Sequence, residues 1–290
     1  MNKNARAGDV SVLTAREFEQ IRRLAHDQFG LDLREGKETL VSTRLSKKIR
    51  ELNFPSFQAY FRHVIEDRTG ESLIALIDAL TTNYTSFFRE PAHFDFLRET
   101  ILPGLRDRGR IDVWSNACST GEEPYSIAFC LIEELGEQAL DRIRILATDI
   151  STRVLDRARQ GAYPAERFQG IPASRLRQYL LRGEGRFQNW YRVKPEVRAA
   201  VEFQRLNLMD RFSHLGPFPV IFCRNVMIYF DRPTQQDLVN RLSDCLEPGG
   251  YLLIGHSESL NGIDHPLRYL RPATYRKPET GEAGRNRSRG

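Results

Sequence analysis

Residues 111–124, IDVWSNACSTGEEP, decide the fold of this chain, because they read as a strand, a tight loop and the start of a helix. The run Ile111-Asp112-Val113-Trp114 is short and rich in β-forming residues. A loop of small residues follows, and Pro124 suits the first turn of a helix that we expect to run to about Leu135. A strand, a loop and a helix in this order are typical of an α/β protein.

The same alternation continues downstream. Further strands are predicted at 143–148, 201–203, 220–223 and 251–255, and helices at 151–160 and 234–246. The last strand is expected to follow a Pro-Gly-Gly turn. Strands that alternate with helices predict a parallel sheet covered on both faces. Residues 161–200 fit this scheme poorly, and residues 187–193 are predicted to pair with 197–201 as a small antiparallel insertion.

The N-terminal part has a helical pattern throughout, from Thr14 to about Thr82. Thr14 and Glu17 form a capping box, and Gly30 supplies a stop for the first helix. Three more amphipathic helices follow, and Ser56 opens the second of these three. Their apolar stripes are Leu45, Ile49, Leu52, then Phe57, Tyr60, Phe61, Val64, Ile65, and then Leu73, Leu76, Ile77, Leu80. This pattern predicts a small all-α bundle.

Composition and charge narrow the classes of function. The net charge is +5, but residues 271–290 alone carry six Lys/Arg against two Asp/Glu, and we expect the tail from Pro278 to Gly290 to be disordered. The charge therefore does not favour nucleic acid as a partner. Apolar runs are too short for a membrane span, no secretory signal is visible, and the four cysteines form no metal or disulfide pattern. We expect a cytoplasmic protein with reduced thiols, no metal and no membrane insertion.

The loop after the first strand indicates the kind of ligand. It lacks the G-x-G-x-x-G of dinucleotide sites and the G-K-[ST] of triphosphate sites. Glu122 and Glu123 at the helix start would repel phosphate but could hold an ammonium group, which favours S-adenosylmethionine; alternatively they only complement the helix dipole. Asp149, at the end of the second strand, is placed to accept ribose hydroxyls or to cap the next helix.

Four longer motifs carry a resemblance to a known family. They are 83–90 (NYTSFFRE), 114–126 (WSNACSTGEEPYS), 148–150 (TDI) and 222–230 (FCRNVMIYF). With these motifs in this order, the chain resembles the CheR family of chemoreceptor glutamate O-methyltransferases from about residue 14 to 277. The resemblance implies a helical N-terminal domain, then a Rossmann-like methyltransferase domain with a small β insertion. We expect domains at 12–82 and 103–277, a linker at 83–102 that contributes to the pocket, an insertion at about 185–202 and a basic tail at 278–290.

The resemblance also implies roles for particular residues. The cofactor S-adenosyl-L-methionine, and its product S-adenosyl-L-homocysteine, would be bound by Asn83, Thr85, Arg89, Glu122 or more readily Glu123, Asp149, Asn207, Leu208, Arg224 and Asn225. Arg89 and Tyr229 would be catalytic. A glutamate carboxylate is already ionised at neutral pH, so the reaction needs orientation and charge screening rather than a general base.

The expected substrate is the cytoplasmic helical region of chemoreceptors, modified by a monomeric enzyme. On the second N-terminal helix, Arg44, Lys47 and Lys48 share one face and would guide this acidic surface; alternatively they form an ordinary solvated face. Two other functions remain open. A nucleic-acid methyltransferase shares the fold, although Arg224-Asn225-Val226-Met227 stands where a Pro-Pro-aromatic motif is expected. A catalytically inactive cofactor sensor or receptor-array scaffold is the other.

Overall fold

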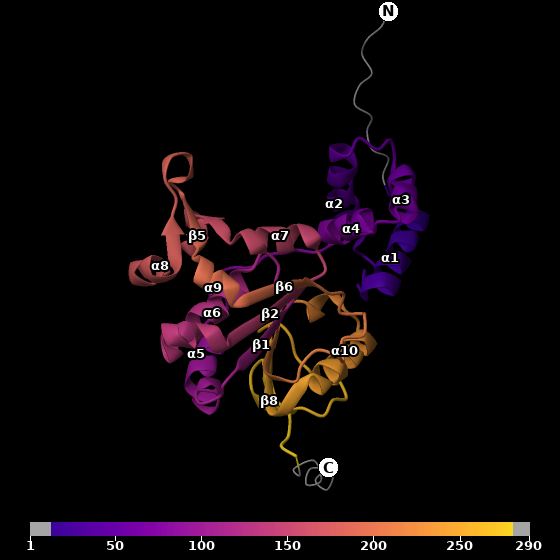
Figure 1. Ribbon diagram of the computed structural model, residues 1–290. Helices are drawn as coiled ribbons and strands as arrows, with labels where there is room; N and C mark the ends of the chain where they lie inside the picture. The colour runs from indigo at the N-terminus through magenta and orange to yellow at the C-terminus, as the bar shows by residue number, and fades with distance from the viewer. Residues whose placement is uncertain (1–12, 281–290) are drawn as a thin grey trace, which may run out of the picture. The chain divides into compact units, whose positions relative to one another are not determined.

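The computed structural model describes residues 13–280 and divides the chain into two compact units (Figure 1). Unit 1 comprises Met1–Asn83 with Tyr229–Asp231, and unit 2 comprises Tyr84–Ile228 with Arg232–Gly290. Residues 1–12 and most of the predicted tail, 281–290, lie outside the described residues. Among those described, no helix is long and apolar enough to cross a membrane.

Unit 1 contains the four predicted helices, α1 (Ala15–Phe29), α2 (Glu38–Glu51), α3 (Phe57–Glu66) and α4 (Glu71–Leu80). The capping box is present: the Thr14 hydroxyl accepts from the Glu17 N–H at 3.2 Å, and the Glu17 carboxylate accepts from the Thr14 N–H at 2.9 Å. Gly30 ends α1 at φ +68°, a conformation that glycine adopts at little cost. Leu52 and Ile65, expected in the apolar stripes, are instead exposed because each lies at the end of its helix.

Unit 2 is built on a seven-stranded sheet in the order β6-β2-β1-β7-β8-β10-β9. The strands β1, β2, β6, β7 and β8 are parallel, whereas β10 is antiparallel to both neighbours. Their bounds are β1 Ile111–Asn116, β2 Ile143–Asp149, β6 Val201–Arg205, β7 Phe218–Cys223, β8 Leu246–Ile254, β9 Arg268–Arg271 and β10 Thr274–Arg276. The predicted α/β class is confirmed. Strand order reverses between β1 and β7, the point at which such sheets bind ligands.

Helices cover both faces of this sheet. The crossovers from β1 to β2 and from β7 to β8 run in opposite directions, so right-handed connections put α6 and α10 on opposite faces (Figure 1). The helices of unit 2 are α5 Ala92–Phe96, α6 Glu122–Leu135, α7 Thr152–Gln160, α8 Ala173–Tyr179, α9 Pro195–Ala199 and α10 Arg232–Asp244. Shorter turns are η1 Leu97–Ile101, η2 Leu102–Gly104, η3 Glu137–Arg142, η4 Ala165–Phe168, η5 Gly185–Phe187 and η6 Met227–Tyr229. α6 is almost entirely buried, which fixes its N-terminus at the sheet edge.

The small antiparallel sheet exists, but its predicted pairing was wrong. It consists of β3 (Ala162–Pro164), β4 (Leu180–Arg182) and β5 (Trp190–Val193) in the order β3-β5-β4. β5 does not pair with 197–201, because Pro195 begins α9 and Val201 begins β6 of the main sheet. The predicted turn at 248–250 was also wrong, since these residues lie inside β8, where the pairing with β7 shifts register.

Candidate functional site

The carboxyl ends of three neighbouring parallel strands create the candidate site. β1, β2 and β7 end at Asn116, Asp149 and Cys223, and their registers bring these residues to one edge of the sheet. The loops that follow contain residues 117–121, 150–151 and 224–226. The segment 84–91 belongs to the same unit and contacts this edge through Glu90 and Arg89.

The backbone at this edge is unusually strained. Of the seven described non-glycine residues with positive φ, five lie here: Phe88, Glu90, Ala117, Ser119 and Asn225. Such conformations cost about 1–3 kcal/mol each and cluster at functional sites. Gly121 is required, because it has φ +93° and a Cβ there would lie 2.8 Å from Ala158 Cβ.

Asp149 has its carboxylate fixed by the loop backbone. Its Oδ2 accepts from the Ser119 N–H and its Oδ1 from the Ser151 N–H, both at 2.9 Å. The helix α7 is capped by the Ser151 hydroxyl, so the alternative in which Asp149 is the N-cap is wrong. A carboxylate accepts hydrogen bonds at about four lone-pair sites, so it is a suitable group for binding a ribose diol.

Glu122 and Glu123 are adjacent in sequence but occupy different environments. Glu122 is completely buried, accepts from the Thr120 hydroxyl at 2.6 Å and pairs with Arg167. Glu123 is 12% exposed, accepts from the Ser115 hydroxyl at 2.7 Å and pairs with Arg224 at 2.8 Å. Of the two glutamates, only Glu123 is therefore both partly exposed and in contact with residues of the sheet edge, Ser115 and Arg224.

Arg224, directly after β7, is a buried guanidinium with two carboxylate partners. Its Nη1 lies 2.8 Å from Glu123 Oε2, and its Nη2 lies 2.9 Å from Glu90 Oε2. Nη2 also donates to the Arg89 carbonyl at 2.6 Å. Despite the cost of burying Glu90, the charge of Arg224 and the donors around it hold the pKa of Glu90 below its usual range. Glu90 thus remains ionised beside Arg224, which also pairs with Glu123.

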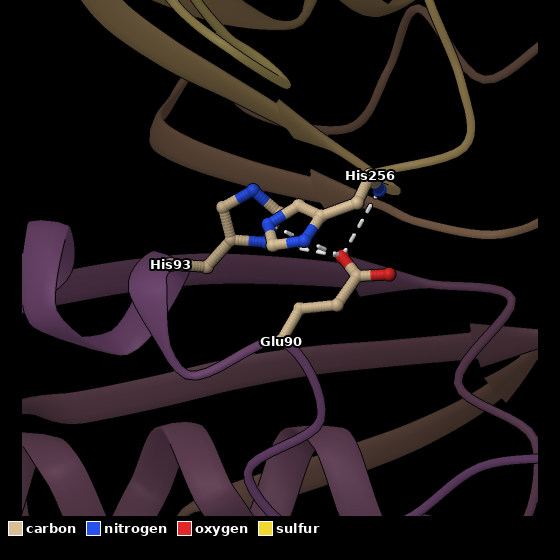
Figure 2. A group of neighbouring side chains, drawn as sticks. All are labelled: Glu90, His93 and His256. Atoms are coloured by element: carbon tan, nitrogen blue, oxygen red, sulfur yellow. Dashed lines mark hydrogen bonds and ion pairs between the residues drawn. The ribbon is translucent and has the colours of Figure 1, made fainter.

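Two histidines approach the same oxygen of Glu90, as Figure 2 shows. His93 Nδ1 lies 3.5 Å and His256 Nε2 3.9 Å from Glu90 Oε2, and the three potential ligand atoms lie within 4.8 Å of one another. That spacing is compatible with a metal ion, but Arg224 already contacts this oxygen. Burial and the nearby Arg224 lower the pKa of His93 to about 3, so the imidazole stays neutral. We assign the cluster no metal, because the same surroundings that disfavour a proton disfavour a metal cation.

Glu258 organises the loop that contains Asn225. Its Oε2 accepts from the N–H groups of Asn225 at 2.9 Å and Gly255 at 2.6 Å, and its Oε1 accepts from Ile228 at 3.3 Å. Burial raises its pKa. Glycine is favoured at position 255, since a Cβ there would lie 2.9 Å from the backbone nitrogen of Asn225.

The other expected cofactor residues of unit 2 also have defined places. Arg89 donates to the Tyr84 carbonyl at 2.9 Å and stays partly exposed, with further N–H groups available. Thr85 is buried. Asn207 accepts from the Met209 N–H at 3.1 Å, and the Leu208 carbonyl accepts from Arg241. Asn207 and Leu208 follow β6, which is next to β2 in the sheet.

The remaining expected site residues belong to unit 1. Asn83 donates to Asp78 at 3.1 Å, and the Tyr229 hydroxyl both donates to the Thr82 carbonyl and accepts from its N–H. Arg44 is not part of a free basic face, because it donates to the Leu80 carbonyl and to the Thr82 hydroxyl. Lys47 is exposed and Lys48 half-buried.

Three contributors to the site were missed from the sequence: Ser115, Glu90 and Glu258. Ser115 and Glu90 lie inside motifs that were recognised, and Glu90 directly follows Arg89, which was assigned a role. A signal for Glu258 is its position four residues after the end of β8, in the loop at the same sheet edge. For none of the three does the sequence alone indicate which residues the side chain contacts.

The donor set fits S-adenosylmethionine. Asp149 presents a fixed carboxylate for a diol, and Glu123 presents one for an ammonium group. No lysine or arginine lies in the loop 115–121, which argues against a phosphate ligand. The crowding around Gly121 shows that the loop lies close against α7, where only small residues fit.

Comparison with known proteins agrees with this chemistry. Residues 83–275 match the "CheR methyltransferase, SAM binding domain", and residues 16–81 match the "CheR methyltransferase, all-alpha domain". The chain is 40% identical to a chemotaxis protein methyltransferase of Borreliella burgdorferi, over 96% of this chain and 100% of the relative. It is 43% identical to chemotaxis protein methyltransferase 2 of Pseudomonas aeruginosa (90% and 93%) and 39% identical to the Escherichia coli protein (87% and 87%).

These matches span both units and nearly the full length of the relatives, so the similarity is not limited to the common sheet. Residues 83–275 form an S-adenosylmethionine-binding methyltransferase domain, and the chain belongs to the CheR methyltransferase family.

Proposed function

We propose that this protein is a cytoplasmic, monomeric chemotaxis methyltransferase that esterifies glutamate side chains in the helical region of chemoreceptors. The observation that carries the proposal is the pair of carboxylates, Asp149 and Glu123, fixed at the carboxyl edge of a methyltransferase sheet, next to a loop (115–121) that contains no lysine or arginine to bind phosphate. Membership of the CheR family supports a chemoreceptor as the substrate.

Different residues of unit 2 would bind different parts of S-adenosylmethionine. Asp149 would hold the ribose hydroxyls, and Glu123 the ammonium group of the amino-acid part. Asn207 and Leu208 would flank the adenine, while Thr85, Arg224 and Asn225 would line the pocket. For Asn83, which belongs to unit 1, the same role is proposed from the family resemblance alone. Glu122, bound to Arg167 in the interior, would support the loop without touching the cofactor.

The proposed reaction requires the protein mainly to orient the receptor carboxylate relative to the methyl group. Bound S-adenosylmethionine would supply an electrophilic methyl group on its sulfonium. A receptor glutamate is ionised at neutral pH, so no side chain has to remove a proton before it attacks. Arg89 retains guanidinium N–H groups that could orient this carboxylate. For Tyr229 to donate a hydrogen bond to this carboxylate, its hydroxyl would first have to break the hydrogen bond that it donates to the Thr82 carbonyl.

Transfer of a radiolabelled methyl group to purified receptor tests the proposal. The label should appear on receptor glutamates and be released as methanol at high pH, as expected of an ester. Label that survives base would point to N-methylation, and absence of label would favour a non-catalytic protein. Arg89→Ala should lower kcat by more than it weakens cofactor binding, because orientation matters chiefly in the transition state.

A further inference from the structure

The carboxylates and the guanidinium at the sheet edge do not balance in charge. Glu90 and Glu123 both pair with Arg224, whose side chain is only 1% exposed. Two carboxylates against one guanidinium leave a surplus of one negative charge. A surplus charge at a largely buried position is costly unless a partner cation compensates it.

Neither imidazole near Glu90 offers a firm second cation. His93 is buried, has no hydrogen-bond partner among the described residues, and is kept neutral by burial and by Arg224. His256 Nε2 is 3.9 Å from the carboxylate, and its ring is about half exposed to water (Figure 2). Among the described residues, Arg224 is thus the one Lys or Arg side chain that pairs with these two carboxylates, and a bound cationic ligand would balance the remaining negative charge.

Glu90 also connects three segments at the sheet edge. Its Oε1 accepts from the Asn225 side-chain amide at 3.2 Å, and its Oε2 accepts from the His256 N–H at 3.2 Å as well as pairing with Arg224. The segment 84–91 is thereby fixed to the loops after β7 and β8. Substitution of Glu90 should consequently affect every ligand of the edge to some extent, and its charge should affect cationic ligands in addition.

We propose that Glu90 is a positioning residue whose charge, through Arg224, strengthens the binding of cationic S-adenosylmethionine more than that of neutral S-adenosylhomocysteine. The donor carries a sulfonium, an ammonium and a carboxylate, for a net charge of +1, and the product lacks the sulfonium charge. Both ligands carry the ammonium group that we place beside Glu123, so the ligands differ in the sulfonium charge, which the surplus negative charge attracts in the donor alone. This inference rests on the proposed place of the cofactor beside Glu123 and Arg224.

Calorimetric titration of both ligands at pH 8 separates charge from structure. Glu90→Gln keeps the size of the side chain and removes the charge and one acceptor. It should raise the Kd of S-adenosylmethionine on the order of tenfold more than that of S-adenosylhomocysteine, as expected for unit charges about 8–10 Å apart in a partly buried site. Glu90→Asp keeps the charge and should keep the wild-type ratio of the two Kd values.

A matched control is Glu247→Gln, which breaks the ion pair with Arg108. It should change neither Kd. A second uncharged variant, Glu90→Thr, must shift the ratio in the same direction as Glu90→Gln, and thermal unfolding checks that each variant folds. Equal losses for both ligands, or no loss for either, would overturn the proposal.

Failure of the underlying site assignment gives a different result. Glu123→Gln with wild-type affinity for S-adenosylmethionine would show that the cofactor does not bind at this edge. If Glu123→Gln weakens binding but Glu90→Gln leaves the ratio unchanged, the site assignment stands and the charge role of Glu90 is wrong.

Discussion

Two charged regions of this protein differ in the environment of their charges: in one the charges are buried and paired, and in the other they are exposed. At the sheet edge of unit 2, Arg224 is buried and pairs with two carboxylates. On α2 in unit 1, Lys47 is exposed and forms no ion pair among residues 13–280, whereas Arg44 is bound to the end of α4. Buried pairs act at short range and resist salt, whereas exposed charges act weakly over distance and are screened. The edge should therefore control cofactor binding, and the helix should control encounter with an acidic partner.

The largest effect is expected when the buried cation is removed. Arg224→Gln leaves Glu90 and Glu123 facing each other without a counter-charge, and should lower the free energy of unfolding by about 3–5 kcal/mol. Urea unfolding of the cofactor-free protein measures this. The control Arg108→Gln breaks a more exposed pair with Glu247 and should cost at most about 1 kcal/mol. Similar losses in both variants would mean that burial of Arg224 has no energetic consequence.

His93 should make the same region sensitive to acid. Burial and Arg224 hold its folded-state pKa at about 3, below the 6.5 of a free imidazole. As pH falls from 6.5 towards 3 the unfolded chain therefore takes up a proton that the folded protein does not, and stability decreases. The slope from this group is at most about 1.4 kcal/mol per pH unit. His93→Phe should remove that part of the slope in urea unfolding across this window; a slope that is unchanged would place the acid sensitivity elsewhere.

A smaller loss is expected for the ribose contact. Asp149→Ala should weaken S-adenosylmethionine binding by about 1–3 kcal/mol, because ribose hydroxyls would lose their acceptor. Isothermal titration measures the Kd. Asp156→Ala serves as control, since Asp156 is an exposed residue of α7 that pairs with Arg159. Equal affinity in a folded Asp149→Ala protein would contradict the ribose assignment.

The smallest effect should come from α2. Reversal of Lys47 and Lys48 to Glu should raise the receptor KM by roughly threefold to fivefold at low ionic strength, and the difference should vanish at high salt. Arg44 must be left in place, because its loss would disturb α4. Reversal of Arg62 and Arg68 to Glu, with the same change in net charge, is the control. If both pairs behave alike, the α2 face is an ordinary solvated surface.

The parts of the structure that depend on local contacts were predictable. The Thr14–Glu17 capping box and the strand–loop–helix at 111–124 involve residues close in sequence, and both were identified correctly. The pairing of β5 with β3 and β4 was not, because short strands can pair with several candidates and Pro195 diverts the next segment into a helix. The role of Glu90 was missed for a different reason: its partner Asn225 is 135 residues away in the sequence, and only the folded chain brings the two together.

The most direct test of the site is a crystal structure of the protein with S-adenosylhomocysteine bound. The ribose hydroxyls should lie within hydrogen-bonding distance of the Asp149 carboxylate, and the ammonium group should lie beside Glu123, with Arg224 still between Glu123 and Glu90. Ligand density elsewhere, or an Asp149 bonded only to the backbone N–H groups of Ser119 and Ser151, would contradict the assignment.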